Sequence, residues 1–270
     1  MDKILLIDAH NFIWRGMVFY NTINAPKDII MVFNFFKNFR AIVEQFKPNK
    51  IFMAWEGHPK FRYDLFADYK ANRIVKTASK QENNEIFNKS KYTIKNLLSK
   101  MPVTSARSEN YEADDVIATL CEQMKDEELT IVSSDTDYIQ LLQRNYKSIN
   151  LYNPIKKQFI EAPPYPYTIW KSFVGDKSDN IPKILSENKT MKLLSNPEEL
   201  DSFLSIEENR ANFSINLKLI EFANIPDEEL IIEDGVVDFI EIKKSFIEME
   251  FNTILSKWSN FKSTFDCVTI

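Results

Sequence analysis

The first half of the chain contains short apolar runs that each end on a carboxylate. The first run is apolar on both sides of Lys3, as expected of a central parallel strand. In an open parallel α/β sheet the functional crevice lies beyond the carboxyl ends of the strands, so we expect these carboxylates to face one cleft. The runs are KILLID ending at Asp8, KIFMAWE ending at Glu56, and LTIVSSDTD with Asp135 and Asp137.

Helical spacing of apolar residues separates these runs. Residues 29–46 carry apolar side chains three and four positions apart, and Pro48 ends the pattern. Residues 86–98 and 110–120 have helical patterns as well. The alternation predicts an α/β fold over residues 1–160, with a mostly parallel central sheet and helices on both faces.

The pattern changes after residue 160, where it becomes helical and acidic. Three prolines, Pro163, Pro164 and Pro166, mark the change. We therefore predict a smaller helical C-terminal lobe over residues 161–270, joined to the core in one compact molecule. A short helix and two paired strands are expected just before it, at residues 138–142, 146–153 and 158–160.

The stretch NYEADDVIATL, residues 110–120, places three carboxylates at the start of an otherwise apolar helix. Glu112 and Asp115 are three apart and share a face, with Asp114 beside them. Like charges at this density must be neutralised, solvated or held by a cation. Acidic residues also favour the first turn of a helix because they complement its dipole, so this stretch alone does not decide for a metal.

A further pair of carboxylates, Asp176 and Asp179, lies in GDKSDNIP and brings the candidates to nine. The cluster contains no His or Cys. Carboxylate-only sets suit hard cations such as Mg²⁺ or Mn²⁺, and a pair of such ions supports in-line displacement at phosphorus.

Composition bounds the class of protein. With 270 residues, 44% of them apolar, the chain can fill one sizeable core and is not disordered. No apolar run approaches the ~18 residues of a membrane span, and MDKILLID is typical of a strand and not of a signal peptide. Cys121 and Cys267 have no metal-site or disulfide spacing, so we expect a reducing, cytoplasmic setting, with Cys121 as a core residue.

The net charge of −5 conceals a basic segment between residues 60 and 107. A basic segment beside an acidic cleft suits a metal-dependent nuclease, because cations bind phosphates while carboxylates bind metals. The alternative is a solvated helix face. The acids in this segment are Asp64, Asp68, Glu82 and Glu85. They are outnumbered by the bases, which are Lys60, Arg62, Lys70, Arg73, Lys76, Lys80, Lys89, Lys91, Lys95, Lys100 and Arg107.

Five motifs together resemble the 5′-nuclease family of flap endonucleases and 5′ to 3′ exonucleases, most closely the bacteriophage RNase H type. The resemblance covers most of the chain and implies a PIN-like fold, a helical arch around residues 70–100 and a setting in a phage-infected bacterial cell. The motifs, in family order, are LLIDAHNFIWR, YKANR at residues 69–73, YEADD, SSDTD and GDKSDNIP.

The same resemblance assigns roles to the candidate residues. It implies that Lys70 and Arg73 contact the reacting phosphate, while Tyr69 stacks on a base or, alternatively, packs in the core. Arg62, Lys76 and Lys80 are expected to bind nucleic acid. Two Mg²⁺ or Mn²⁺ ions are implied, the first served by Asp8, Glu56, Glu112 and Asp114, the second by Asp135, Asp137, Asp176 and Asp179, with Asp115 between them.

The chain departs from the family pattern at three places. Glu56 stands where the family usually has Asp, and Ala67 where it usually has Pro. GDKSDNIP should begin a helix-hairpin-helix region with a glycine-rich turn that binds K⁺ and a duplex phosphate, but residues 183–190 read KILSENKT. Without glycines the backbone cannot easily approach a phosphate, which speaks against the K⁺ site; Lys183 and Lys189 are candidate substitutes.

The sequence thus predicts a metal-dependent 5′-nuclease that hydrolyses phosphodiesters near the 5′ ends of RNA·DNA and flap or duplex DNA, removing primers or flaps in replication. We expect a monomer without membrane contact, and a replication clamp or single-strand-binding protein as a candidate partner. One alternative is a PIN-like endoribonuclease, which would lack the arch and GDKSDNIP. The other is a non-catalytic protein that binds branched nucleic acid, which would have lost metal ligands.

Overall fold

A mixed β-sheet forms the centre of the molecule. The computed structural model describes residues 1–17, 25–73 and 77–270. Within them the sheet has seven strands in the order β6-β5-β4-β1-β2-β3-β7; the middle five are parallel, and the edge strands β6 and β7 are antiparallel to their neighbours. The strands are β1 (Lys3–Asp8), β2 (Lys50–Trp55), β3 (Thr104–Arg107), β4 (Glu128–Val132), β5 (Ser148–Asn153), β6 (Gln158–Ile160) and β7 (Ile231–Asp234).

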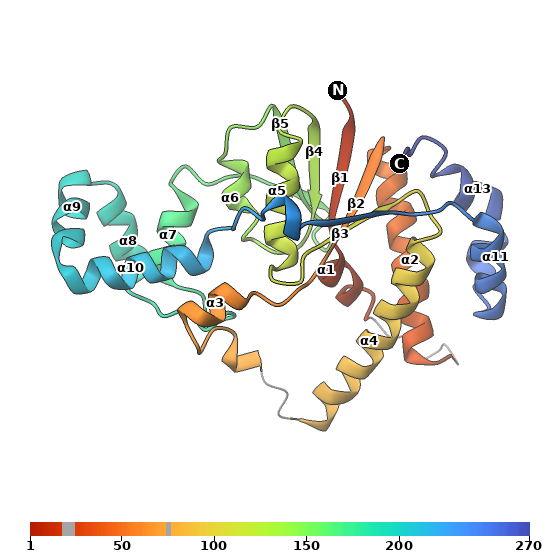
Figure 1. Ribbon diagram of the computed structural model, residues 1–270, viewed down its shortest axis with the longest axis horizontal. Helices are drawn as coiled ribbons and strands as arrows, with labels where there is room; N and C mark the ends of the chain where they lie inside the picture. The colour runs from red at the N-terminus through yellow and green to blue at the C-terminus, as the bar shows by residue number, and fades with distance from the viewer. Residues whose placement is uncertain (18–24, 74–76) are drawn as a thin grey trace.

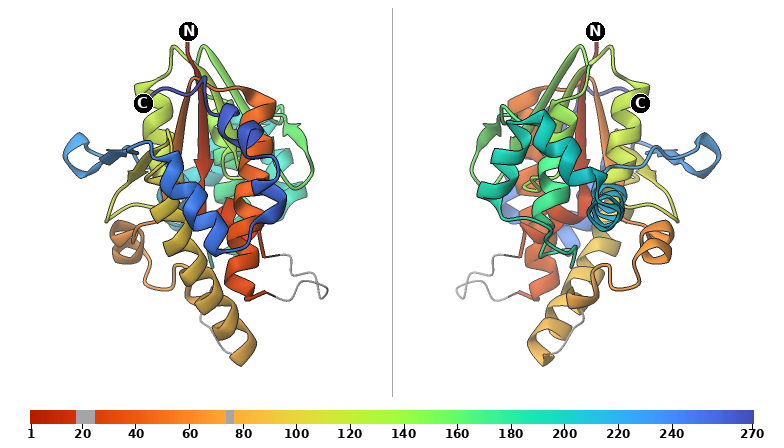
Figure 2. Two further views of the ribbon diagram at one scale, coloured as in Figure 1. Left: turned by 90° about the vertical axis from the view of Figure 1, so that its right-hand side faces the viewer. Right: turned by 90° about the vertical axis from the view of Figure 1, so that its left-hand side faces the viewer.

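Helices cover both faces of the sheet, which confirms the predicted fold class (Figures 1 and 2). One face packs against α1 (Ala9–Trp14), α2 (Lys27–Phe46) and α4 (Ala78–Leu98), through side chains such as Phe35, Phe39 and Ile94. The other face packs against α5 (Ala113–Gln123) and α6 (Ile139–Leu142), with Cys121 fully buried there as expected. Successive strand residues alternate between the two cores, as in Ile4 and Leu5.

A small helical lobe extends from one side of the sheet (Figure 1). It consists of α7 (Tyr167–Val174), α8 (Glu187–Leu194), α9 (Pro197–Ser205) and α10 (Glu207–Ile220). The short helix α3 (Lys60–Leu65) packs against α10 and so links the lobe to the core. Asn216 of α10 donates side-chain hydrogen bonds to the carbonyls of Ser172 (2.9 Å) and Pro182 (2.7 Å), which holds α7 and the following loop in the lobe.

The last forty residues correct the predicted C-terminal lobe over residues 161–270. After the 3-10 turn η2 (Asp227–Glu229), β7 pairs with β3 in the main sheet. The helices α11 (Phe239–Glu248), α12 (Asn252–Leu255) and α13 (Trp258–Ser263) then pack on α2, with the Phe246 and Phe36 rings 5.2 Å apart. They lie on the side of the sheet opposite α7–α10 (Figure 1). The prediction was wrong because helical spacing of apolar residues predicts that one face of a helix is buried. It does not indicate which other helices that face packs against.

The helix α4 projects away from the body of the molecule at its N-terminal end (Figure 1). Its C-terminal half is anchored on α2 by Phe87, Ile94, Leu97 and Leu98, which are all buried. Its first half is polar, and residues 80–82 and 85 are exposed. Within the described residues, no helix combines the length and the apolarity needed to cross a membrane.

Candidate metal-binding cleft

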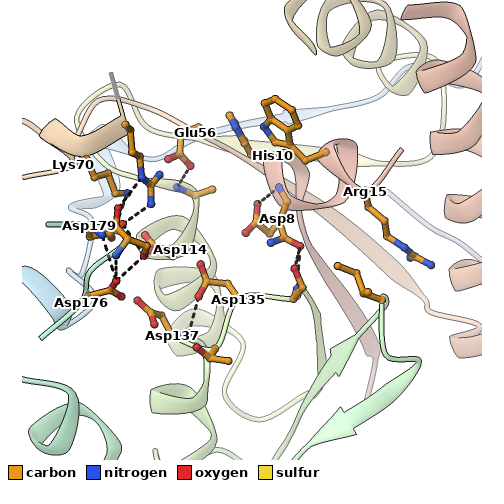
Figure 3. A pocket seen from close by; sticks show the side chains of 18 of the residues that line it. Asp8, His10, Arg15, Glu56, Lys70, Asp114, Asp135, Asp137, Asp176 and Asp179 are labelled. Carbon is orange, nitrogen blue, oxygen red and sulfur yellow. Dashed lines mark hydrogen bonds and ion pairs between the residues drawn. The ribbon is translucent and has the colours of Figure 1, made fainter. Parts of the chain in front are cut away.

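A cleft of about 600 Å³ opens at the carboxyl ends of β1, β2 and β4, where the sequence predicted it (Figure 3). The N-terminus of α5 and the loop after α7 complete its walls. Seven of the nine candidate carboxylates line this cleft, namely Asp8, Glu56, Asp114, Asp135, Asp137, Asp176 and Asp179.

Asp8 joins the first strand to the first helix. Its carboxylate caps α1 by accepting a hydrogen bond from the Asn11 amide at 3.0 Å, and it also accepts bonds from the hydroxyls of Ser133 and Tyr138, both at 3.3 Å. Asp8, and not Asn11, is therefore the residue that caps α1. Its side-chain oxygen accepts from the backbone N–H and hydroxyl of Ser134, which ties the loop after β4 to α1.

Glu56 is placed by the glycine that follows it. A Cβ on Gly57 would lie 2.0 Å from the Ser108 carbonyl oxygen, so only glycine lets the end of β2 approach the loop before α5 this closely. The approach brings Glu56 to the N-terminus of α5, where its carboxylate accepts a hydrogen bond from the Ala113 amide at 3.1 Å. Asp114 extends from the first turn of the same helix into the cleft.

These three carboxylates are difficult to ionise together. Burial, with the charge of Asp135, raises the pKa of Asp8 to about 6. Burial and the charges of Asp115 and Glu112 raise the pKa of Asp114 well above its usual value. Enclosure by the cleft wall and repulsion from Glu112 and Asp8 also raise the pKa of Glu56, although this side chain is partly open to solvent, which weakens the effect. A cation at this end of the cleft would relieve the repulsion.

Glu112 and Asp115 turn away from the cleft and meet Arg62. The Arg62 guanidinium donates to Glu112 at 2.9 Å and to both oxygens of Asp115 at 2.6 and 2.8 Å, and its Nε donates to the Leu219 carbonyl. Glu112 and Asp115 also form a capping box at the start of α5. Carboxylate oxygens of Glu112, Asp114 and Asp115 lie within 4.8 Å of one another, but Asp114 is the member of this group that lines the cleft.

The predicted nucleic-acid contact at Arg62 is wrong for a physical reason. Arg62 is 1% exposed, and its charge neutralises two buried carboxylates instead of a phosphate. Tyr69 is 3% exposed and its hydroxyl donates to Glu112 at 2.9 Å, so it packs in the core, which was the alternative to base stacking. Motif spacing identified both residues but could not indicate that their side chains point inward.

The second group of carboxylates surrounds a lysine that the sequence reasoning missed. The Lys171 ammonium of α7 contacts Asp137 and lies 2.7 Å from Asp176. Burial would raise the pKa of Asp176, but Lys171 and hydrogen bonds from Ser178 outweigh it and lower the pKa to about 2. For Asp137 burial outweighs Lys171, and the pKa is raised to about 6. The sequence feature that could have identified Lys171 is its position as the single Lys within the apolar stretch YTIWKSFV, five residues before Asp176.

Lys70 and Arg73 reach the cleft from the segment that leads to α4. Lys70 lies beside Asp179 (Figure 3), with 3.7 Å between its ammonium and the carboxylate. Lys70 also contacts Glu112, and Arg73 contacts Asp179. Burial would lower the pKa of Lys70, but the charges of Glu112 and Asp179 outweigh it and raise the pKa. Both cations therefore remain charged at neutral pH and lie beside the carboxylates.

Hydrogen bonds attach this segment to the loop that carries Asp176 and Asp179. The Lys70 amide donates to the Asp179 carbonyl at 2.9 Å, and the Asn180 side chain donates to the Asp68 carbonyl at 2.8 Å. The Asn72 side chain donates to the Lys177 carbonyl at 2.6 Å. Residues about a hundred positions apart in sequence thus form one wall of the cleft.

The remaining predicted nucleic-acid contacts lie outside the cleft. Lys80 is exposed on the first half of α4, and Lys183 and Lys189 are exposed on the helical lobe. Lys76 lies outside the described residues. In the lobe, the backbone N–H groups of Ile184 and Leu185 both donate to the Phe173 carbonyl, at 2.8 and 2.9 Å.

The α/β sheet with a carboxylate cleft at its strand ends has the fold of the 5′-nucleases, as structural comparison shows. The structure of bacteriophage T5 flap endonuclease, in a complex with DNA and metal ions, superposes with a TM-score of 0.65 at 14% identity, covering 98% of each chain. That of T5 5′-exonuclease with bound zinc gives 0.64 at 15% identity over 81% of this chain and 86% of that one.

Sequence comparison identifies the family. Residues 3–164 match the family described as "5'-3' exonuclease, N-terminal resolvase-like domain". A 5'-3' exonuclease of Mycoplasmopsis pulmonis is 31% identical over 220 residues, which are 76% of this chain and 71% of that protein. The chain belongs to the 5′-3′ exonuclease family. DNA polymerase I of Lactococcus lactis is 28% identical over 231 residues, 77% of this chain, but the match spans only 25% of the polymerase.

Proposed function

We propose that the chain is a metal-dependent phosphodiester hydrolase that acts near the 5′ ends of RNA·DNA and of flap or duplex DNA. The observation that carries this proposal is the grouping of seven carboxylates in one cleft beside Lys70 and Arg73. Acids alone would suit a metal store, and cations alone would suit a phosphate-binding surface. Their combination suits hydrolysis of a phosphodiester.

The residues of the cleft fit two Mg²⁺ or Mn²⁺ ions. All seven side chains offer oxygen atoms, and hard cations prefer such donors. Asp8, Glu56 and Asp114 would hold the first ion, with Glu112 acting behind them; Asp135, Asp137, Asp176 and Asp179 would hold the second. Bound divalent ions of this kind ionise a water molecule near neutral pH and stabilise negative charge at phosphorus.

The chain's own cations act on the phosphate. Lys70 and Arg73 stay protonated, and both lie at the edge of the cleft where they can contact a phosphate oxygen. A fixed positive charge is most effective where negative charge develops during the reaction. His10 lines the cleft, but burial and the charges of Lys91, Arg73 and Lys70 lower its pKa to about 4. It is therefore neutral at physiological pH, and the Phe87 ring lies 4.5 Å from it.

The arch expected around residues 70–100, of which 74–76 lie outside the described residues, serves in this proposal to cover the cleft, with Lys80 and neighbouring bases attracting the unpaired strand. Lys183 and Lys189 bind duplex phosphates as point charges. The turn at residues 183–190 lacks the family's glycines, and its Ile184 and Leu185 N–H groups already donate to the Phe173 carbonyl, so this proposal includes no K⁺-linked backbone contact to a phosphate there. Exchange of K⁺ for Na⁺ at constant ionic strength should accordingly leave duplex affinity unchanged, and a clear K⁺ dependence would contradict this part.

We propose that the biological task is removal of RNA primers and flaps during replication, by a monomer in the cytoplasm of a phage-infected cell. A clamp or single-strand-binding protein is a candidate partner. The intact set of cleft carboxylates argues against a protein that has lost catalysis. The arch expected around residues 70–100 and the GDKSDNIP motif, both of which a PIN-like endoribonuclease would lack, argue against that alternative.

A labelled-flap assay tests the proposal. The substrates are a DNA flap, a blunt duplex and an RNA·DNA hybrid, each with a label at the 5′ end, incubated with Mg²⁺ or with EDTA. We expect Mg²⁺-dependent products, whose length separates exonuclease from flap cutting. Metal-independent cleavage, or cleavage of single-stranded RNA alone, would contradict the proposal.

A further inference from the structure

The helix α11 has apolar residues on two opposite faces. Ile242 and Phe246 point into the core and are fully buried. Ile240 and Ile247, seven residues apart and hence on one stripe, point outward and are 85% and 57% exposed. A helix that is apolar on both sides is typical of one buried on both sides. The outer stripe of α11 is thus an unpartnered apolar face.

This face forms one wall of a groove between α11 and α13, with a volume of about 650 Å³. Phe239 and Trp258 lie at its base, and both also pack against the core. In the left view of Figure 2, α11 and α13 lie at the front of the molecule with no other element over them. The groove shares no lining residue with the metal-binding cleft, and α2 lies between α11 and the central strands (Figure 1).

Three lysines and one acid, Glu248, line the groove, so its rim is positive. Lys243 and Lys244 extend from α11 and Lys262 from α13, and all three are exposed. Two of them lie over the aromatic base: Lys243 Nζ is 6.0 Å from the Trp258 ring centre, and Lys262 Nζ is 6.0 Å from that of Phe239. None of the three forms an ion pair with a described carboxylate. A local positive rim on a chain of net charge −5 indicates an acidic partner.

We infer that this groove is a docking site for an acidic segment of another protein, which places apolar side chains on Ile240 and Ile247 and carboxylates against the three lysines. A second copy of the chain fits poorly, because a two-fold interface would set the lysines of one copy against those of the other. A nucleic acid also fits poorly, because exposed isoleucines offer nothing to phosphates.

The test uses the full chain and an unbiased set of probes. Random peptides of about 16 residues, enough for a four-turn helix, are displayed on yeast and selected on the protein. Two groove variants are compared, Ile240→Gln with Ile247→Gln, and Lys243→Gln with Lys244→Gln and Lys262→Gln. A matched control carries Lys192→Gln with Ile206→Gln, two exposed positions on the opposite side of the molecule. All substituted side chains are exposed, so folding should be preserved.

We expect the enriched peptides to combine Asp or Glu with large apolar residues, and to lose at least about tenfold in affinity on each groove variant but not on the control. Enrichment of basic or uncharged peptides, or affinities unaffected by the groove variants, would overturn the inference. Two further results would overturn it: single-stranded DNA that competes for the groove through the lysines alone, or a dimer in light scattering that Ile240→Gln with Ile247→Gln dissolves. Flap cleavage by the groove variants should match wild type, so failure here is distinct from failure of the proposed function.

Discussion

The two ends of the cleft neutralise their carboxylates in different ways. At the end formed by β1, β2 and α5, the pKa values of Asp8, Glu56 and Asp114 are raised, so bound protons help to neutralise these carboxylates. At the end formed by the loop after α7, the side chains of Lys171, Lys70 and Arg73 contribute positive charge to Asp137, Asp176 and Asp179. Within the described residues, the first end therefore holds three acids without an internal cation, whereas the second holds acids paired with cations, although burial still raises the pKa of Asp137 there to about 6.

The difference predicts two kinds of metal binding. A metal that enters the first end displaces protons, so its affinity should fall steeply as the pH drops below the raised pKa values. A metal that enters the second end must compete with ammonium and guanidinium groups, whose charge does not change near neutral pH. The first ion should accordingly bind with the stronger pH dependence.

Removing one carboxylate from either end should have the largest effect. Asp114→Ala and Asp135→Ala should each lower the cleavage rate by on the order of 10³-fold, because each end stabilises charge in the transition state. Binding of a flap in the presence of Ca²⁺ should change little, since the basic side chains provide affinity. Asp126→Ala, an exposed acid far from the cleft, is the matched control. Full activity in either cleft variant would show that the corresponding end of the cleft does not contribute to cleavage.

Removing the internal cation should reverse the balance at the second end. In Lys171→Met, Asp137 and Asp176 lose their partner, and the metal-free free energy of unfolding should fall by about 2–3 kcal/mol. Mg²⁺ should restore most of the loss, because it replaces the missing charge. Urea denaturation with Mg²⁺ and with EDTA measures both, with Lys125→Met as the control. An equal loss in both conditions would mean that Lys171 stabilises by packing alone.

Lys70 should have a smaller effect that appears in the rate. Lys70→Ala should slow single-turnover cleavage by about 10–100-fold while changing substrate affinity less than about threefold, because one phosphate contact among many adds little to binding. The comparison with Lys125→Ala controls for loss of net charge. If affinity falls while the rate is unchanged, Lys70 is a docking residue.

The smallest effect should be a pH dependence of stability without metal. The folded protein binds the Asp8 proton more tightly than the unfolded chain does, since the pKa is raised to about 6. This contribution is complete below pH 4 and is lost as the pH rises through 6, so the free energy of unfolding should fall by about 1–2 kcal/mol. Asp8→Asn should make the curve above pH 5 less steep, with the remaining slope due to Glu56, Asp114 and Asp137, and Asp126→Asn should leave it unchanged. A curve for Asp8→Asn that matches wild type would assign the pH dependence to other groups.

Much of the sheet was predictable because burial and strand direction leave a direct pattern. KIFMAW became β2 with the expected ends, and Asp8, Glu56, Asp135 and Asp137 meet at one edge as parallel strands require. The orientation of a side chain around one turn leaves no such pattern, which is why Arg62 was expected on the surface. β7 has only four residues, and three of them are exposed, so nothing in its composition marks it as a strand.

The attachment of residues 68–73 to the loop at 176–180 should hold the protein together after cleavage of the backbone within α4. Residues 68–73 are held by that loop, and the second half of α4 is held against α2 by Phe87 and Ile94. A cut engineered in the exposed first half of α4, after Lys80, should leave both fragments associated in one folded particle. Under the proposed role of residues around 70–100 as an arch, such a split enzyme would be open at its side, and a circular or end-blocked strand could then reach the cleft without a free terminus.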